Sequence, residues 1–305
     1  MACFLGIDTS NYTTSAAVMV DGEIKKNIKL PVKVADGARG IRQSDAVFSH
    51  VKNLPAVIEA VGELHPDAIG YSAYPRDNEG SYMPCFLAGE ATARSLASIL
   101  GIPAYPFSHQ AGHVAAAVYS SGKPELYNAP FIAFHVSGGT TDMLLVEAKN
   151  RITRIGGTKD LNAGQAVDRT GILLGLDFPC GPALEALCEI KKPIKCGAVS
   201  VKGLECNLSG LENKIKDRIA AGHSHAEIAA FLFSYIIKTL DRMTENALEV
   251  YGKIPLLFAG GVMSNRIIKD YFSSKYGAHF AEPAFSCDNA AGIAYLCSER
   301  FKELS

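Results

Sequence analysis

An internal repeat limits this chain to very few folds. The two repeated segments are GIDTSNYTTSAAVMVDGEI at 6–24 and AFHVSGGTTDMLLVEAKNRI at 133–152. Each contains an apolar strand, a turn with Thr-Thr, a second apolar strand and a third strand after another short turn. Helices and further strands follow in both halves. The repeat predicts a duplicated α/β fold made of two β-β-β-α-β-α halves.

Hydrophobic periodicity and the positions of Gly and Pro predict the elements of each half. Expected strands are 3–9, 14–20, 68–73, 102–107, 131–137, 141–148, 151–157 and 255–261. Expected helices are 44–65 with an interruption at Pro55, 86–100, one beginning after Ser108, 162–175, 181–190, 224–250, one ending near Tyr276, and 288–301. We expect an N-terminal lobe at 1–125 and a C-terminal lobe at 126–288, with the last helix, about 289–305, packing back on the first lobe.

This plan resembles the superfamily of actin, sugar kinases and heat-shock ATPases. In that superfamily two lobes each open with a strand–turn–strand, and both turns face an interlobe cleft. Backbone N–H groups of such turns grip phosphates when glycine or other small residues leave them accessible.

Composition excludes several classes of protein. The 305 residues are 48% hydrophobic and 20% charged, which is ordinary for a globular protein and excludes wholesale disorder. Thirty basic and 31 acidic residues nearly cancel, so no global charge indicates a nucleic-acid partner. Two stretches are locally basic, 25–42 and 189–218, and either could meet a phosphate backbone or be an ordinary solvated face.

The cysteines and the N-terminal segment indicate the compartment. Eight cysteines form no C-x-x-C pair and are expected to be reduced thiols. The first residues, MACFLGIDTS, lack the basic stretch of a signal peptide. No apolar run approaches the roughly 18 residues of a membrane span. We therefore expect a cytoplasmic protein with no membrane contact.

Ser108-His109-Gln110-Ala111-Gly112-His113 is the sharpest local motif. Histidines at i and i+4 project from one face of a helix, so both can ligate one metal ion. The alternative is two ordinary histidines at helical spacing. No Glu follows His109, so the motif is not that of a zinc peptidase. A third ligand must come from a distant segment, and Asp288 is either that ligand or the N-cap of the last helix.

Three further segments could contact a phosphorylated ligand. Ser137-Gly138-Gly139-Thr140-Thr141 follows an apolar strand and is either a phosphate-binding turn or a plain hairpin turn. Gly260 and Gly261 lie between a strand and a helix, where backbone amides readily meet an anion, although such glycines are often only structural. Asp168 falls within an expected helix, facing either a pocket or solvent.

Taken together, the motifs resemble the TsaD family, which makes tRNA threonylcarbamoyladenosine and was once called O-sialoglycoprotein endopeptidase. They extend from about Phe4 to Tyr295. In chain order they are LGIDTS, SHQAGH, HVSGGTT, NAGQAVDRTGILLGLDFPCGP, SGL, FAGGVMSNR and CDNAAGIAY.

The resemblance implies a metal-dependent acyltransferase of the actin-like ATPase fold. It implies one divalent ion, iron or zinc, on His109, His113 and Asp288. It also implies that ATP, ADP or an acyl-adenylate, with Mg²⁺ as an accompanying ion, contacts the chain. The implied contacts are His135, Val136, Ser137, Gly138, Gly139, Asp168, Gly181 and Asn265. The implied reaction moves a threonylcarbamoyl group from its adenylate to the adenosine next to the tRNA anticodon, with adenylate-forming and accessory proteins as partners.

Several positions that line the family's cleft are altered in this chain. The family's carboxylates, histidine and small turn residues at these positions are replaced by Tyr12, Thr13, Tyr74, Arg76, Thr140, Leu161 and Gln165. Two other functions therefore stay open: a metal- and nucleotide-binding subunit or regulator without transfer activity, and a carbamoyl-type transferase with a small-molecule acceptor. The sequence assigns no catalytic residue. It also leaves the oligomeric state open, with a dimer as one option.

Overall fold

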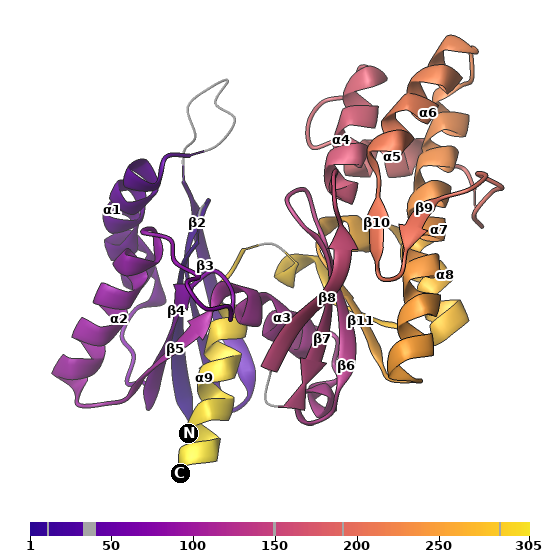
Figure 1. Ribbon diagram of the computed structural model, residues 1–305. Coiled ribbons are helices and arrows are strands. Elements are labelled where there is room, and N and C mark those ends of the chain that lie inside the picture. Colours follow the sequence, from indigo (N-terminus) through magenta and orange to yellow (C-terminus); the bar gives the residue numbers. More distant parts are fainter. Residues whose placement is uncertain (11, 33–40, 149–150, 191, 287) are drawn as a thin grey trace. The chain divides into compact units, whose positions relative to one another are not determined.

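The computed structural model describes residues 1–10, 12–32, 41–148, 151–190, 192–286 and 288–305 (Figure 1). The chain divides into two compact units, Met1–Gly122 with Ala284–Ser305, and Lys123–Pro283. Residues 284–286 and 288 group with the first unit here, whereas the prediction assigned 126–288 to the second lobe.

The first unit contains a five-stranded sheet in the order β3-β2-β1-β4-β5. Strand β1 pairs antiparallel with β2 and parallel with β4, and β5 extends the parallel half. The elements of this unit are β1 (Cys3–Ser10), β2 (Thr13–Val20), β3 (Glu23–Pro31), α1 (Gln43–Val61), β4 (Ala68–Tyr74), α2 (Phe86–Leu100), β5 (Ala104–Ser108), α3 (His109–Ser120) and α9 (Ala291–Leu304).

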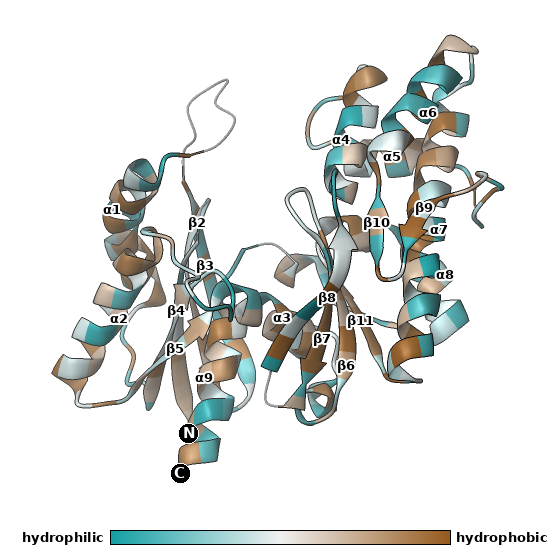
Figure 2. Cartoon of the chain, in the orientation of Figure 1, coloured by the Kyte–Doolittle hydropathy of each residue, from teal (hydrophilic) through white to brown (hydrophobic). Residues whose placement is uncertain are grey.

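The second unit contains a seven-stranded sheet in the order β12-β11-β6-β7-β8-β10-β9. Its strands β6, β7 and β11 carry mostly apolar residues (Figure 2). Its elements are η1 (Pro124–Asn128), β6 (Phe131–Val136), β7 (Thr141–Glu147), β8 (Arg151–Thr158), α4 (Ala163–Leu173), α5 (Gly181–Leu187), β9 (Ser200–Lys202), β10 (Glu205–Asn207), α6 (Ser209–Ala220), α7 (His225–Tyr251), β11 (Leu256–Ala259), η3 (Gly261–Ser264), α8 (Arg266–Tyr276) and β12 (His279–Phe280). The short helix η4 (Pro283–Phe285) spans the boundary between the two units.

The two sheets share one topology, which confirms the predicted duplication. In each, a central strand pairs antiparallel with the next strand of the chain on one side. On the other side it pairs parallel with a strand that follows at least one helix. The series β3-β2-β1-β4-β5 therefore corresponds to β8-β7-β6-β11-β12. The pair β9 and β10 is an addition to the second sheet.

Several details of the predicted helices were wrong. Helix α1 ends at Val61 rather than at 65, and α5 ends at Leu187 rather than at 190. Helix α1 runs without a break through Pro55. Pro55 and Val51 both face solvent, so the Val51 carbonyl, which loses its helical N–H partner to the proline ring, can bind water instead. The last helix begins at Ala291 rather than at 288. Strands β9 and β10 and helix α6 were not predicted; each strand has only three residues, and α6 buries only Leu211 and Ile215.

Helix α9 lies against β1 and α3 in the first unit, and two glycines permit this close approach. A Cβ atom on Gly6 of β1 would come within 2.6 Å of the Ala290 carbonyl oxygen at the start of α9. A Cβ atom on Gly292 of α9 would clash with the Gly112 carbonyl oxygen of α3. Because Gly112 stands between His109 and His113, this contact places the start of α9 beside both histidines.

The seven described cysteines form no disulfide with one another, and Cys287 lies outside the described residues. Within the described part of the chain, no helix is both long enough and apolar enough to cross a bilayer.

Candidate functional site

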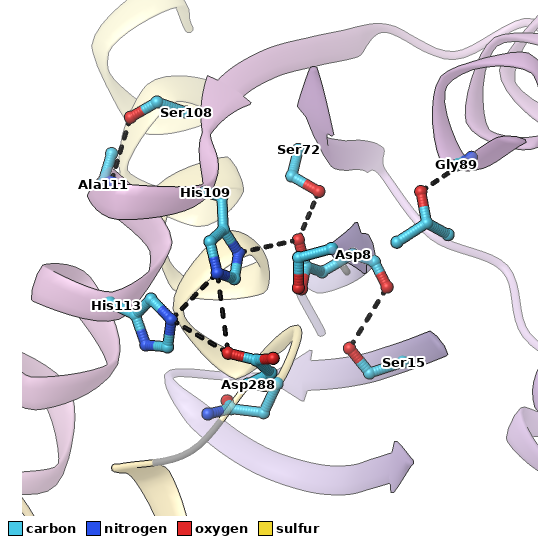
Figure 3. A network of polar contacts seen from close by, with 12 residues as sticks. Asp8, Ser15, Ser72, Gly89, Ser108, His109, Ala111, His113 and Asp288 are labelled. Atoms are coloured by element: carbon cyan, nitrogen blue, oxygen red, sulfur yellow. Dashed lines mark hydrogen bonds and ion pairs between the residues drawn. The ribbon is translucent and has the colours of Figure 1, made fainter. Parts of the chain in front are cut away.

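Three side chains from two segments of the first unit meet at the start of α3 (Figure 3). Strand β5 ends at Ser108, whose hydroxyl accepts a hydrogen bond from the Ala111 N–H at 3.0 Å and so caps α3. The cap fixes the first turn of α3, on which His109 and His113 share one face. Asp288 reaches the same point from the segment before α9.

The three ligand atoms form a small triangle. His109 Nε2 lies 3.0 Å from His113 Nε2, His113 Nε2 lies 3.2 Å from Asp288 Oδ1, and His109 Nε2 lies 3.6 Å from the same oxygen. A triangle with these edges has a circumradius of about 1.9 Å, slightly shorter than the roughly 2.0–2.2 Å bonds that zinc makes to imidazole and carboxylate. One ion can therefore bond to all three atoms. Two imidazoles and one carboxylate suit zinc or ferrous iron.

The structure distinguishes the two roles considered for Asp288. Helix α9 begins at Ala291 and is capped by Ala290, while the Asn289 Oδ1 atom accepts from the Ala291 N–H at 3.0 Å. The Asp288 carboxylate instead points at the two histidines (Figure 3). Its position fits a ligand and not a helix cap.

A fourth residue of the cluster, Asp8, was not singled out from the sequence. Asp8 lies on β1 with a fully buried side chain. Its Oδ1 atom is 3.1 Å from His109 Nδ1 and also accepts a hydrogen bond from the Ser72 hydroxyl. Its Oδ2 atom accepts from the Ser10 hydroxyl at 2.7 Å. The signal that could have identified it is the one charged residue of the strand CFLGIDTS, directly after the apolar run CFLGI.

The electrostatics of this cluster favour a bound cation. Burial disfavours the charged form of His109, but the nearby carboxylates of Asp8 and Asp288 outweigh it and raise the His109 pKa to about 10. Burial likewise opposes ionisation of Asp288, yet its hydrogen bonds to His109 and His113 hold its pKa well below the usual range. The buried carboxylate of Asp8 and the half-buried carboxylate of Asp288 thus favour a positive charge between them, which either a proton on His109 or a metal ion can supply.

A second site lies wholly in the second unit. It is a pocket of about 450 Å³ between α4, α5 and the turn that follows β11. Five of the residues expected to contact nucleotide line it, along with the apolar side chains of Val167, Phe178, Phe233 and Val262. Those five are Gly138, Asp168, Gly181, Gly261 and Asn265.

Asn265 gives this pocket an available hydrogen-bond donor. Its side chain is 5% exposed, and its Oδ1 atom accepts from the Ile268 N–H at 3.1 Å, which caps α8. Its Nδ2 atom has no hydrogen-bond partner among the described residues. A buried amide donor without a partner costs free energy unless a ligand or water accepts from it. Asp168 differs, because its Oδ1 atom already accepts from the Cys180 N–H at 3.0 Å.

The other predicted contacts lie beside this pocket. Ser137 N–H donates to the Thr140 carbonyl at 2.7 Å and closes the β6–β7 hairpin, whose tip carries Gly138 and Gly139. Val136 is buried in β6, and His135 on the same strand is half-buried. Gly260 has φ of 99°, and a Cβ atom there would clash with the Val136 carbonyl oxygen. The packing of β11 against β6 therefore requires glycine at position 260.

Of the altered positions, Leu161 is buried in the core of the second unit and Gln165 completes the capping box of α4 with Asn162. Tyr12 is 46% exposed. Leu161 therefore has a core role that an acidic residue would not fill, whereas a glutamate at position 165 could form the same capping box.

Comparison with solved structures shows an actin-like ATPase fold. Component A of the (R)-2-hydroxyglutaryl-CoA dehydratase of Acidaminococcus fermentans matches with a TM-score of 0.59 at 16% identity, over 98% of this chain and 99% of that chain. A ROK family protein of Streptococcus pneumoniae matches with a TM-score of 0.54 at 12% identity, over 99% of both chains. Full-length HypF, in its phosphate- and nucleotide-bound form, matches with a TM-score of 0.62 at 13% identity, over 100% of this chain but 56% of HypF.

The fold and the His-His-Asp cluster of the first unit define a broad class of protein, and the sequence narrows that class to one family. The model of the TsaD family, tRNA N6-adenosine threonylcarbamoyltransferase, matches residues 27–295. The chain belongs to this family.

Proposed function

We propose that this protein is a metal-dependent transferase that moves a threonylcarbamoyl group from its adenylate to the adenosine next to a tRNA anticodon. The observation that carries the proposal is the His109–His113–Asp288 triangle in a chain of the TsaD family. The proposed partners are tRNA and the adenylate-forming and accessory proteins of the same pathway.

The three residues of the triangle would hold one iron or zinc ion. Such an ion supplies Lewis-acid polarisation of a carbonyl or carbamoyl oxygen and fixes its position. Asp8 accepts from the Nδ1–H of His109 and so keeps Nε2 available as the ligand atom. Asp288 completes the set with one carboxylate oxygen.

The pocket of the second unit would hold the adenylate, or ATP or ADP with Mg²⁺. Gly138 and Gly261 leave backbone amides accessible, and a Cβ atom at either would meet open space. Asn265 offers its unpartnered Nδ2 donor to an acceptor on the ligand. The phosphate- and nucleotide-bound state of HypF, a protein with the same fold, supports a nucleotide in this fold.

One observation favours a second candidate, a metal- and nucleotide-binding member without transfer activity. Leu161, Gln165 and Thr140 stand where the family has acidic residues and a histidine, and Leu161 is 5% exposed. A buried aliphatic side chain cannot orient a substrate or accept a proton.

A transfer assay tests the proposal. Purified protein is mixed with preformed threonylcarbamoyl-adenylate, an unmodified tRNA transcript and the accessory proteins, and modified adenosine is measured by nucleoside mass spectrometry. Product is expected from the wild type and from His65→Ala, which changes an exposed histidine outside the cluster, and none from His109→Ala. Absence of product from the wild type, with metal and ADP still bound, would favour the second candidate.

A further inference from the structure

A coil in the second unit is held firmly along helix α7. Ile194 N–H donates to the Ser234 hydroxyl at 2.9 Å, and the Cys196 thiol lies 3.7 Å from the Ser234 carbonyl oxygen. One turn further along α7, the Lys238 ammonium group donates to the Gly197 carbonyl. Lys195 therefore stands on a coil anchored on both sides of it, beside Lys238.

Helix α6 brings two more cations to the same place. The Arg218 guanidinium lies 3.7 Å from the centre of the Phe231 ring of α7. Burial raises the pKa of the Cys196 thiol, and the charges of Lys238, Arg218 and Lys214 act against that rise. Lys192 and Lys238 also line one groove between α7 and α8. We call Lys192, Lys195, Lys214, Arg218 and Lys238 the basic face.

The charge of the basic face is largely uncompensated. None of its five cations takes part in an ion pair with another described residue, and four of the five are exposed lysines. Acidic groups nearby are already occupied: Glu212 pairs with Arg169 and Lys216, and Asp241 pairs with Lys275. Three exposed acidic residues, Asp217, Glu189 and Asp270, the last of which lines the same groove as Lys192 and Lys238, reduce the net charge of the basic face without cancelling it.

We propose that the basic face binds the phosphate backbone of an RNA. This proposal rests on the proposed function, in which tRNA is the acceptor. Exposed lysines act as point charges that release condensed counterions from a polyanion and impose no base sequence. An acidic protein partner would also be attracted, but a stable protein interface needs an apolar centre. The basic face instead presents exposed lysines, with Ile194 as an exposed apolar side chain among them. The other basic stretch, 25–42, offers fewer unpaired cations whose positions are described. Lys33 and Arg39 lie outside the described residues, and Lys25 pairs with Glu23.

The test is a binding titration without adenylate, so that transfer chemistry plays no part. Fluorescently labelled tRNA transcript is titrated with the full chain by anisotropy at salt concentrations from 50 to 300 mM. The test variant is Lys195→Glu with Lys214→Glu. The control is Lys52→Glu with Lys253→Glu, which makes the same charge change at exposed lysines elsewhere. Thermal unfolding of both doubles verifies that they fold.

The test variant is expected to raise the Kd for tRNA at least tenfold and to flatten the slope of log Kd against log salt by about 1.4–1.8, the value for two lost phosphate contacts. The control is expected to stay within about twofold of the wild type. Equal affinity of the test and control variants would overturn the proposal, as would a wild type that does not bind tRNA at 50 mM salt. Normal tRNA binding by the test variant with lost capture of an accessory protein would assign the face to a protein partner instead. A wild type that binds tRNA through this face but makes no modified adenosine would contradict only the proposed function.

Discussion

The Nδ1 atom of His109 lies 3.1 Å from Oδ1 of Asp8, a residue 101 positions earlier in the chain. With Nδ1 facing this carboxylate, Nε2 is the ring atom that faces His113 and Asp288 (Figure 3). A carboxylate behind a histidine fixes the ring orientation and increases the basicity of the ligating nitrogen. Ser10 and Ser72 in turn hold the Asp8 carboxylate, so the orientation of His109 is determined by β1 and β4 of the central sheet.

Replacing Asp8 should therefore weaken metal binding without removing a ligand. We expect Asp8→Asn to lower zinc affinity about 10- to 100-fold. The measurement is competition with a chromophoric chelator. Asp142→Asn, which changes another buried aspartate that pairs with Arg154 in the second unit, is the control and should bind zinc like the wild type. An unchanged zinc affinity in Asp8→Asn would show that the carboxylate does not act on the metal through His109. Ser72→Ala should give a smaller loss of affinity in the same direction.

Metal binding should release a proton at neutral pH. The His109 pKa of about 10 means that this imidazole is protonated in the metal-free protein, whereas a ligand nitrogen must be unprotonated. Metal affinity should accordingly rise with pH until pH reaches the His109 pKa, because fewer protons remain to be displaced. Calorimetric titrations at pH 7.5 in buffers of different ionisation enthalpy measure the number of protons released. A heat of binding independent of the buffer would contradict this expectation.

The arrangement of the sheets was predictable because it rests on local patterns. Alternating apolar residues, Asp21-Gly22 and the Ser137–Thr140 turn mark strands and hairpins within a few residues of each other. The i, i+4 histidines were visible for the same reason. The role of Asp8 was not, because it depends on a contact between β1 and α3 that no local pattern encodes. Nor could sequence patterns reveal that one end of the Asn265 amide caps α8 while the other has no partner.

Substitutions can separate the role of the Asn265 Oδ1 atom from that of its Nδ2 atom. Asn265→Asp keeps an oxygen that accepts from the Ile268 N–H but loses the free Nδ2 donor, so we expect near-normal stability and at least tenfold weaker ADP binding. Asn265→Ala loses both and should also lower the free energy of unfolding by about 1 kcal/mol. Urea unfolding and calorimetric titration with ADP measure the two effects. Unchanged ADP affinity in both variants would show that the pocket does not use this donor.

Gly292 lies where α9 contacts α3 and touches no ligand atom, yet its replacement should change the metal site. A Cβ atom on Gly292 would clash with the Gly112 carbonyl oxygen, so Gly292→Ala must push the start of α9 away from α3. Asp288 precedes that helix and would move with it, away from His109 and His113. We expect a loss of about 1–3 kcal/mol in the free energy of unfolding from overpacking, together with weaker zinc binding. Gly210→Ala is the matched control, because a Cβ atom there meets open space in α6 and should leave zinc binding unchanged. If Gly292→Ala destabilises the protein but binds zinc normally, the position of Asp288 does not depend on the position of α9.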